Sequence, residues 1–264
     1  NNVVEVNDTA APILRATATT LKVRVPASAT TGPVTVTTAE GTATSPEPLV
    51  IGSLGPERAA VPTTDLLAYW TFDTDGRDDA DGLDLTFQGG LALTPGRLGQ
   101  GLRFTGDPAR VAIRPADDAA LDFGATDFSL ALWARWTTLG GEQVLIEKCH
   151  GASGCGGGGW SLTKLPDQSL LLHPFVRSAP NAVLADRWHH VAVVRGGGLV
   201  RLYVDGVLSA EAGAGGIAPV ADPFQIGERA GGQQFPMNGL IDEIGIWARA
   251  LTPDEVAALA AMGP

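Results

Sequence analysis

Short apolar runs that alternate with polar residues recur along most of the chain and predict β-strands. The run FSLALWARW, residues 128–136, has the alternation expected of a strand that is buried on at least one face. The runs HHVAVVR and LVRLYVDGV predict two further strands joined by a glycine turn at residues 196–198. Because the chain contains 34 Gly and 18 Pro, long helices are not expected, and the pattern indicates an all-β protein.

The C-terminal stretch NGLIDEIGIWARALTPDEVAAL predicts a strand followed by a short helix. The helix should begin after Thr252, because Pro253 and Glu255 complete a capping box with it. In the strand, Asp242 and Glu243 are neighbours and should point to opposite faces of a sheet. They are therefore not expected to form the pair of carboxyl groups, about 5 to 10 Å apart, that glycoside hydrolysis requires.

Composition divides the chain near residue 62. Residues 1–62 hold 4 basic and 5 acidic side chains, and residues 63–264 hold 14 and 24, so the charges are −1 and −10. Thr-rich and Val-rich runs around residues 17–45 predict a hairpin with a further strand, and the prolines that follow predict a linker. We predict a small β unit at 1–52, a linker at 53–64 and a large β domain at 65–264.

The charge and the hydropathy pattern exclude several classes of partner. The net charge of −11 disfavours binding to phosphate backbones, so no nucleic acid partner is expected. No apolar run approaches the roughly 18 residues of a membrane span, and the first residues have no signal-peptide pattern.

The large domain resembles the laminin G-like members of the concanavalin A-like lectin/glucanase superfamily. The resemblance covers about residues 66–261 and depends on ordered motifs: LLAYWTFD, LGQGLRFTGDPARVAI, FSLALWARW, RWHHVAVVRGGGLVRLYVDGV and FQIGERAGGQQFPMNGLIDEIGIWARALTPDEV. It implies an antiparallel two-sheet jelly roll. Residues 1–51 are similar to the second half of an IPT/TIG domain, an immunoglobulin-like sandwich of bacterial surface proteins, whose opening strands are absent. This resemblance implies a spacer, with a ligand site as the alternative, and the missing strands either belong to a longer parent chain or are replaced by another surface.

The acidic loop FDTDGRDDADGLD places six Asp within twelve residues, which is a costly density of like charge. A structural calcium ion would neutralise it, and a solvated acidic turn is the alternative. The spacing does not fit an EF-hand. The family resemblance implies that the calcium ligands are Asp79, Asp81 and Asp242, with Asp73 as a weaker fourth.

Cys149 and Cys155 are the only cysteines and lie six positions apart in a glycine-rich loop, which can bring their Cα atoms to the distance of a disulfide. We predict that they are bonded. A zinc site with His150 is the alternative, but no fourth ligand is near in the sequence.

No catalytic motif is recognisable: the chain has no Gly-x-Ser-x-Gly, no phosphate loop and no His-Glu-x-x-His. The glucanases of the resembled superfamily carry acidic residues on alternating positions of one strand, where this chain has Leu240 and Ile244. We therefore predict a protein without enzymatic activity. An enzyme elsewhere in the parent chain is a further possibility.

A sugar site would combine aromatic faces with planar polar groups. Three loops offer such residues; taken singly, each aromatic residue is better explained as part of the core, and only their clustering favours a site. The sequence predicts an extracellular bacterial module that binds carbohydrate or another cell-surface ligand; the alternatives are a passive spacer, a protein adhesion domain and, least favoured, a glycanase. The candidate ligand-binding residues are Trp160, His173, Phe175, Arg177, Arg229, Gln233, Gln234 and Phe235.

Overall fold

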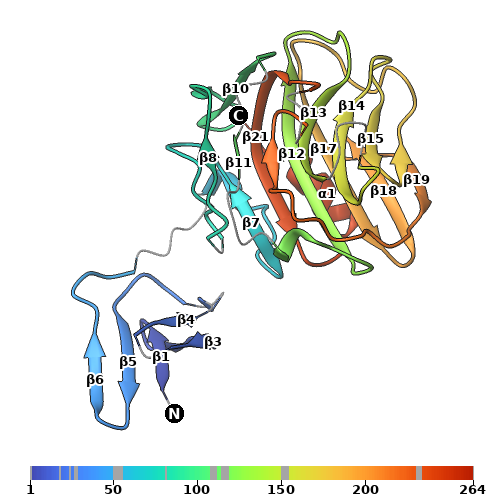
Figure 1. Ribbon diagram of the computed structural model, residues 1–264. Coiled ribbons are helices and arrows are strands. Elements are labelled where there is room, and N and C mark those ends of the chain that lie inside the picture. The colour runs from blue at the N-terminus through green and yellow to red at the C-terminus, as the bar shows by residue number, and fades with distance from the viewer. Residues whose placement is uncertain are drawn as a thin grey trace. The chain divides into compact units, whose positions relative to one another are not determined.

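The chain forms two compact units, Asn1–Ala59 and Ala60–Pro264, here called unit 1 and unit 2 (Figure 1). The boundary between them falls inside the segment 53–64 that the sequence predicts as a linker. The computed structural model describes residues 2–17, 19–23, 25–26, 29–49, 56–80, 82–107, 112–113, 119–149, 155–229 and 234–263.

Unit 1 contains a four-stranded sheet in the order β2-β1-β5-β6 and a separate two-stranded sheet, β3-β4. Its core is small and includes Val4 and Val6 of β1. The hairpin predicted within residues 17–45 does not join β4 to β5, because β4 pairs with β3 while β5 pairs with β1 and β6. The elements are β1 (Val3–Val6), β2 (Thr9–Ala10), β3 (Ile13–Ala16), β4 (Leu21–Val23), β5 (Val34–Thr38), β6 (Gly41–Thr44) and the 3₁₀ helix η1 (Pro56–Arg58).

Unit 2 consists of two antiparallel sheets packed face to face. The first, sheet I, has the order β19-β18-β17-β12-β21-β10-β9, and β7 also pairs with β21. Its strands are β7 (Leu66–Trp70), β9 (Ala92–Pro95), β10 (Gln100–Thr105), β12 (Phe128–Trp136), β17 (Trp188–Gly196), β18 (Leu199–Val204), β19 (Val207–Gly213) and β21 (Asn238–Trp247).

Sheet II has the order β16-β15-β14-β13-β20-β11-β8. Its strands are β8 (Thr86–Phe87), β11 (Ala112–Ile113), β13 (Gln143–Cys149), β14 (Gly159–Lys164), β15 (Leu170–His173), β16 (Val176–Arg177) and β20 (Gln225–Ile226), and the 3₁₀ helix η2 spans Ala119–Leu121.

The core of unit 2 lies between the two sheets and is assembled by the alternation seen in the sequence. In β12, Phe128, Leu130 and Leu132 belong to the core cluster, whereas the residues between them lie on the outer face of sheet I. The all-β prediction and the two-sheet arrangement are confirmed.

A single α-helix among the described residues, α1 (Pro253–Ala260), follows β21. Its N-terminus has the predicted capping box: Thr252 Oγ1 accepts from the Glu255 backbone N–H at 3.2 Å, and a Glu255 carboxylate oxygen accepts from the Thr252 N–H at 2.8 Å. Val256 and Leu259 are the buried side chains of the helix. No helix in the described ranges is long and apolar enough to cross a membrane.

Candidate functional site

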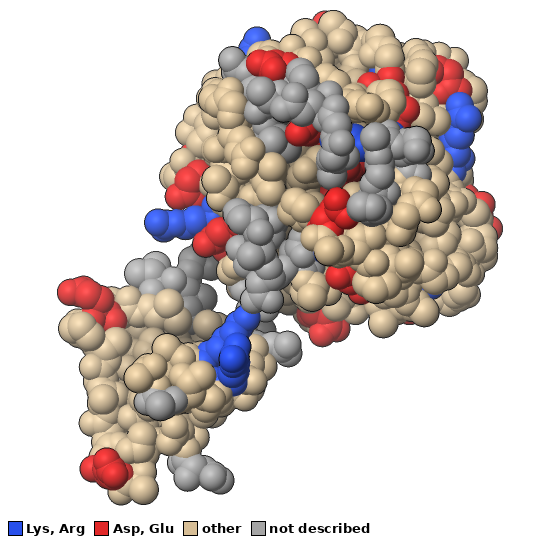
Figure 2. Space-filling view, in the orientation of Figure 1, with Lys and Arg blue, Asp and Glu red and all other residues tan. Residues whose placement is uncertain are grey.

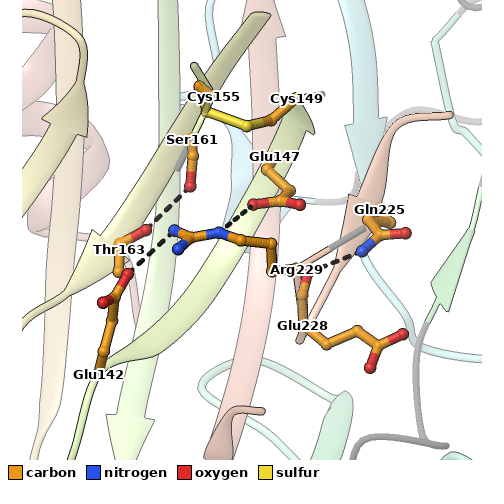
Figure 3. The surroundings of a disulfide bond; sticks show 9 residues. All are labelled: Glu142, Glu147, Cys149, Cys155, Ser161, Thr163, Gln225, Glu228 and Arg229. Carbon is orange, nitrogen blue, oxygen red and sulfur yellow. Dashed lines mark hydrogen bonds and ion pairs between the residues drawn. A yellow bond between two sulfur atoms is a disulfide. The ribbon is translucent and has the colours of Figure 1, made fainter. Parts of the chain in front are cut away.

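Polar side chains gather on the outer face of sheet II, the face turned away from the core (Figure 3). Alternation along β14 produces this arrangement, because Trp160 and Leu162 point into the core while Ser161 and Thr163 point outward. The hydroxyl oxygens of Ser161 and Thr163 are 2.9 Å apart and form a hydrogen bond. Both residues are almost fully buried, so they belong to the base of the site. We call this base the floor: Glu147, Ser161, Thr163, Gln225 and Arg229.

Arg229 lies at the centre of the floor and contacts two carboxylates. Its Nη2 is 2.9 Å from Oε1 of Glu142, and its Nε is 3.6 Å from Oε2 of Glu147. The side chains of Arg229 and Glu147 are 6% and 0% exposed. Because a buried charge costs several kcal/mol unless an opposite charge compensates it, these contacts hold the guanidinium in one position. One cation faces two carboxylates, so the site has no excess positive charge.

Gln225 connects the floor to the neighbouring segment by donating a hydrogen bond from Nε2 to the backbone oxygen of Glu228 at 2.8 Å. Burial, and secondarily the negative charge of Asp107, raises the pKa of Glu228 to about 7. In the part of the chain that the structure describes, Oε2 of Glu228 is buried and has no hydrogen-bond partner. A substantial fraction of this carboxyl is therefore protonated at neutral pH, in which form it can donate a hydrogen bond.

Exposed and half-exposed side chains surround the floor and form what we call the rim: Glu142, His173, Gln234 and Phe235. His173 lies opposite Ser161 in the β14-β15 pair, and burial, followed by the charge of Arg229, lowers the pKa of its imidazole. The Phe235 ring lies 4.8 Å from the Arg229 guanidinium carbon. Gln234 is exposed and pairs through its backbone oxygen with the Arg229 N–H. The rim thus offers an aromatic face, an imidazole and planar polar groups at the surface.

The structure brings four of the predicted ligand-binding residues together, namely His173, Arg229, Gln234 and Phe235, but it places others elsewhere. Trp160 cannot present a face to a ligand, because it is 0% exposed, packs on Phe123 at 5.4 Å and donates its Nε1–H to the Leu121 backbone oxygen. Its prediction as a surface residue is wrong.

The remaining predicted residues lie away from the floor. Phe175 packs against the core cluster, with the Arg195 guanidinium carbon 5.7 Å from its ring. Arg177 is on the edge strand β16, where it pairs with Asp167 at 2.6 Å. Gln233 lies outside the described residues.

Four floor residues were missed by the sequence reasoning: Glu147, Ser161, Thr163 and Gln225. A pattern that could have identified two of them is present in GWSLTK, where Ser161 and Thr163 alternate with Trp160 and Leu162. Gln225 likewise alternates with the core residues Phe224 and Ile226, but Glu147 stands in a run without such alternation, and only strand pairing places the two side by side.

The predicted disulfide between Cys149 and Cys155 is confirmed, with the two Cα atoms 5.0 Å apart. It joins the end of β13 to the loop before β14 and so lies beside the floor (Figure 3). Because both sulfur atoms are bonded to each other, they are not available as the thiolate ligands of the alternative zinc site.

Two of the acidic residues predicted to bind calcium, Asp242 and Asp73, accept hydrogen bonds from backbone N–H groups. Asp242 accepts hydrogen bonds from the N–H groups of Arg97, Leu98 and Glu243 at 2.7, 3.1 and 2.9 Å. Asp73 accepts from the Gln100 N–H at 2.9 Å, in the same turn.

Of the other two predicted ligands, only Asp79 is among the described residues. Asp79 accepts from the Thr71 hydroxyl at 2.9 Å, and Asp81 lies outside the described residues. No group of three or more His, Cys, Asp or Glu side chains suited to a metal ion occurs within the described ranges. Because Asp81 lies outside these ranges, the calcium site stays a prediction from the sequence.

Asp242 and Glu243 do not point to opposite faces of the sheet as the sequence predicts. The pairing of β21 with β12 shifts register between Ala131 and Trp133, and Glu243 adopts a φ of +51°. Such a bulge inserts one residue into the strand and reorients the side chains around it. Glu243 accepts a hydrogen bond from the Tyr69 hydroxyl at 2.6 Å and lies close enough to Asp242 for the two charges to interact.

The stability of the protein should therefore depend on pH through Asp242. Burial, and then the charge of Glu243, raises the pKa of this carboxyl to about 8, although three backbone N–H groups act in the opposite direction. The unfolded chain loses the same proton near pH 4. Between these values the folded state binds more protons, so the free energy of unfolding should fall as pH rises, by up to about 1.4 kcal/mol per pH unit.

Thermal unfolding of the native protein and of Asp242→Asn between pH 5 and 9 tests this dependence. The asparagine variant keeps an oxygen acceptor but does not titrate, so its melting temperature should fall less steeply across the range. Equal slopes in the two proteins, together with a melting temperature that drops on adding EDTA, would contradict this account and restore the calcium site.

Comparison with known proteins identifies the family to which the fold belongs. A sequence profile described as "Concanavalin A-like lectin/glucanases superfamily" matches residues 110–257, which is more than half of the chain. The chain belongs to this superfamily. The matched residues of this concanavalin A-like protein include every floor and rim residue. They leave out unit 1, whose resemblance to an IPT/TIG domain stays a prediction. No curated protein matches the chain.

Several solved structures have the same fold as this protein, although their sequence identity to it is low. Domain 4 of the extracellular GH43 arabinanase AbnA from Geobacillus stearothermophilus, in complex with arabinotriose, is 21% identical with a TM-score of 0.59, and the match covers 74% of this chain and 98% of that one. The binding domain of Paraclostridial Mosquitocidal Protein 1 is 16% identical with a TM-score of 0.58, covering 75% and 52%. A Trypanosoma rangeli sialidase is 19% identical with a TM-score of 0.57, covering 76% and 33%. At these identities the likeness shows the fold alone.

Proposed function

We propose that unit 2 is an extracellular, non-catalytic carbohydrate-binding module that holds a neutral sugar chain against the rim on the outer face of sheet II. The observation that carries this proposal is the buried floor. A fixed set of hydroxyl, amide and charged groups lies where the outer face of a sheet would otherwise carry flexible, solvated side chains. Because the floor residues are buried, they act by fixing the position of the rim side chains, which are the groups open to a ligand.

The chemistry of the rim suits a pyranose or furanose ring. The Phe235 face can stack on the apolar C–H face of a sugar, and His173, Gln234 and Glu142 can exchange hydrogen bonds with its hydroxyl groups. Their positions depend on the floor, since Arg229 contacts both Phe235 and Glu142. The fold relatives support this class of ligand, because an arabinanase domain is described with arabinotriose and a botulinum neurotoxin is described as interacting with two ganglioside molecules.

A neutral ligand fits the electrostatics better than an anionic one. The charge of Arg229 is compensated by two carboxylates, and residues 63–264 carry a net charge of −10 that would oppose an approaching anion. Shallow sites of this kind bind weakly, near the millimolar range or about −4 kcal/mol, and act through several copies on a surface.

Binding without cleavage also fits the contacts of the site. Glu147 is 0% exposed and paired with Arg229, so it is not placed to reach a glycosidic oxygen as a nucleophile or base. Incubation with the same sugars should release no reducing ends. Release of reducing ends would assign a glycanase activity to this face instead.

Titration calorimetry with arabinotriose, xylotriose, cellotriose and laminaritriose tests the proposal. We expect at least one sugar to bind, and His173→Ala and Phe235→Ala each to weaken that binding about fivefold to tenfold. Phe175→Ala is the matched control, because Phe175 is a half-buried aromatic residue that packs against the core. Equal losses in Phe235→Ala and Phe175→Ala, or no binding to any glycan, would favour a spacer or a protein adhesion domain.

A further inference from the structure

Positive charge is concentrated in one stretch of unit 1, in an otherwise acidic protein. Between Asp8 and Glu40 the sequence has no Asp or Glu, but it has Arg15, Lys22 and Arg24, so this stretch carries a charge of +3 in a chain of −11. Arg24 lies outside the described residues, and the other two stand in the β3-β4 sheet.

The β3-β4 pairing places two of these cations together. Arg15 and Lys22 are direct cross-strand partners, so their side chains lie on the same face of the two-stranded sheet, and both are exposed. Like charges directly opposite one another destabilise a strand pair, and a two-stranded sheet has little stability to lose. Within the described ranges Arg15 forms no ion pair. The exposed Arg15 guanidinium is therefore available to an anion from solution.

The same two side chains line a shallow groove of about 330 Å³ together with Thr17, Thr20 and Leu21. The hydroxyl oxygens of Thr17 and Thr20 are 2.6 Å apart, and the Thr17 oxygen also accepts the Thr20 N–H at 3.0 Å, which fixes the turn between the strands. In Figure 2 the Lys and Arg side chains of the smaller unit gather in one place, and its red Asp and Glu side chains lie apart from them. The groove thus combines two cations with hydroxyl groups and one apolar side chain.

We propose that unit 1 binds an acidic polysaccharide in this groove, with Arg15 and Lys22 contacting carboxylate or sulfate groups on the sugar chain. Hydroxyl groups beside cations match a ligand that carries hydroxyl groups beside anions. An anionic membrane fits less well, because its broad negative surface would also repel the attached unit 2, whose net charge is −10. A single polysaccharide strand can bind in the groove without presenting such a broad negative surface.

Binding of the full chain to immobilised polygalacturonate and dextran sulfate, with neutral dextran as reference, tests this inference. The two acidic polymers distinguish carboxylate from sulfate recognition. We expect binding to at least one of them, weakening as sodium chloride rises from 50 to 300 mM because exposed charges are screened. Arg15→Gln/Lys22→Gln should lower the affinity about tenfold, since two exposed charge contacts are lost.

The matched control is Arg77→Gln/Arg103→Gln, which removes the same charge from exposed residues of unit 2. This control should bind as the native protein does. Equal weakening in both double variants would show a nonspecific charge effect and overturn the inference. It would also be overturned if neither acidic polymer binds, or if phosphatidylglycerol vesicles bind in their place. Both double variants change exposed side chains only, so circular dichroism should confirm that they fold.

Discussion

Replacing Trp160 with alanine should lower the free energy of unfolding by about 3–5 kcal/mol, the range for removing a large aromatic side chain from a packed core. The indole is 0% exposed, its ring centroid lies 6.0 Å from that of Phe224, and its Nε1–H bonds the Leu121 backbone oxygen at 2.9 Å. The variant therefore leaves a cavity and a buried carbonyl without its donor. For a unit of this size the melting temperature should fall by about 10 °C.

Thermal unfolding followed by circular dichroism measures this effect, with Trp160→Phe as the control. The phenylalanine variant keeps most of the apolar volume and loses the hydrogen bond, so its cost should be nearer 1–2 kcal/mol. If Trp160→Ala has the same melting temperature as the native protein but no longer binds sugar, the residue contacts the sugar at the surface and its placement in the core is wrong.

Replacing Arg229 with methionine should cost about 3–5 kcal/mol as well, for an electrostatic reason. The substitution keeps an apolar stem but leaves Glu147, which is 0% exposed, without the cation that compensates it. Glu142 also loses its 2.9 Å partner, but its side chain is 22% exposed and can be solvated, so Glu147 should account for most of the loss.

Chemical denaturation of Arg229→Met, Glu147→Gln and the double variant separates these contributions. The double variant should be more stable than Arg229→Met, because an uncharged glutamine no longer needs a cation in the buried floor. If the free energy lost in the double variant equals the sum of the losses in the two single variants, the buried ion pair does not couple these residues. The description of a fixed floor would then be incorrect.

Local patterns in the sequence were sufficient for much of the fold. Period-2 alternation in β12 identified a strand with one face in the core, and Thr252 with Glu255 identified the start of α1. These features depend on neighbours within a few residues. The short loop between Cys149 and Cys155 likewise limited the pairing to one disulfide.

Other features depend on contacts between distant segments and could not be predicted in this way. Asp242 and Glu243 were assigned to opposite faces because a bulge depends on pairing with β12, which the local sequence does not reveal. Trp160 was predicted as a ligand-binding residue, yet its place in β14 turns the side chain into the core.

In the candidate site, too, local residue types could be recognised from the sequence, but contacts between distant segments could not. His173, Arg229 and Phe235 were recognisable as residue types that suit a sugar, but they come from separate segments and meet only when β14 pairs with β15 and the segment after β20 folds back. Glu147 was not recognised at all, because a single carboxylate in an apolar strand resembles many solvated residues. Its significance is visible only beside Arg229.

The central claim, that unit 2 binds sugar on the outer face of sheet II, is tested most directly by NMR. The full chain, labelled with ¹⁵N, is titrated with whichever of the four trisaccharides binds most tightly, and the shifts of the backbone amides and of the Gln225 side-chain amide are followed. The account predicts changes that cluster at His173, Phe235, Ser161 and Gln225, with none along β12. Changes confined to sheet I, or no change with any of the four sugars, would contradict it.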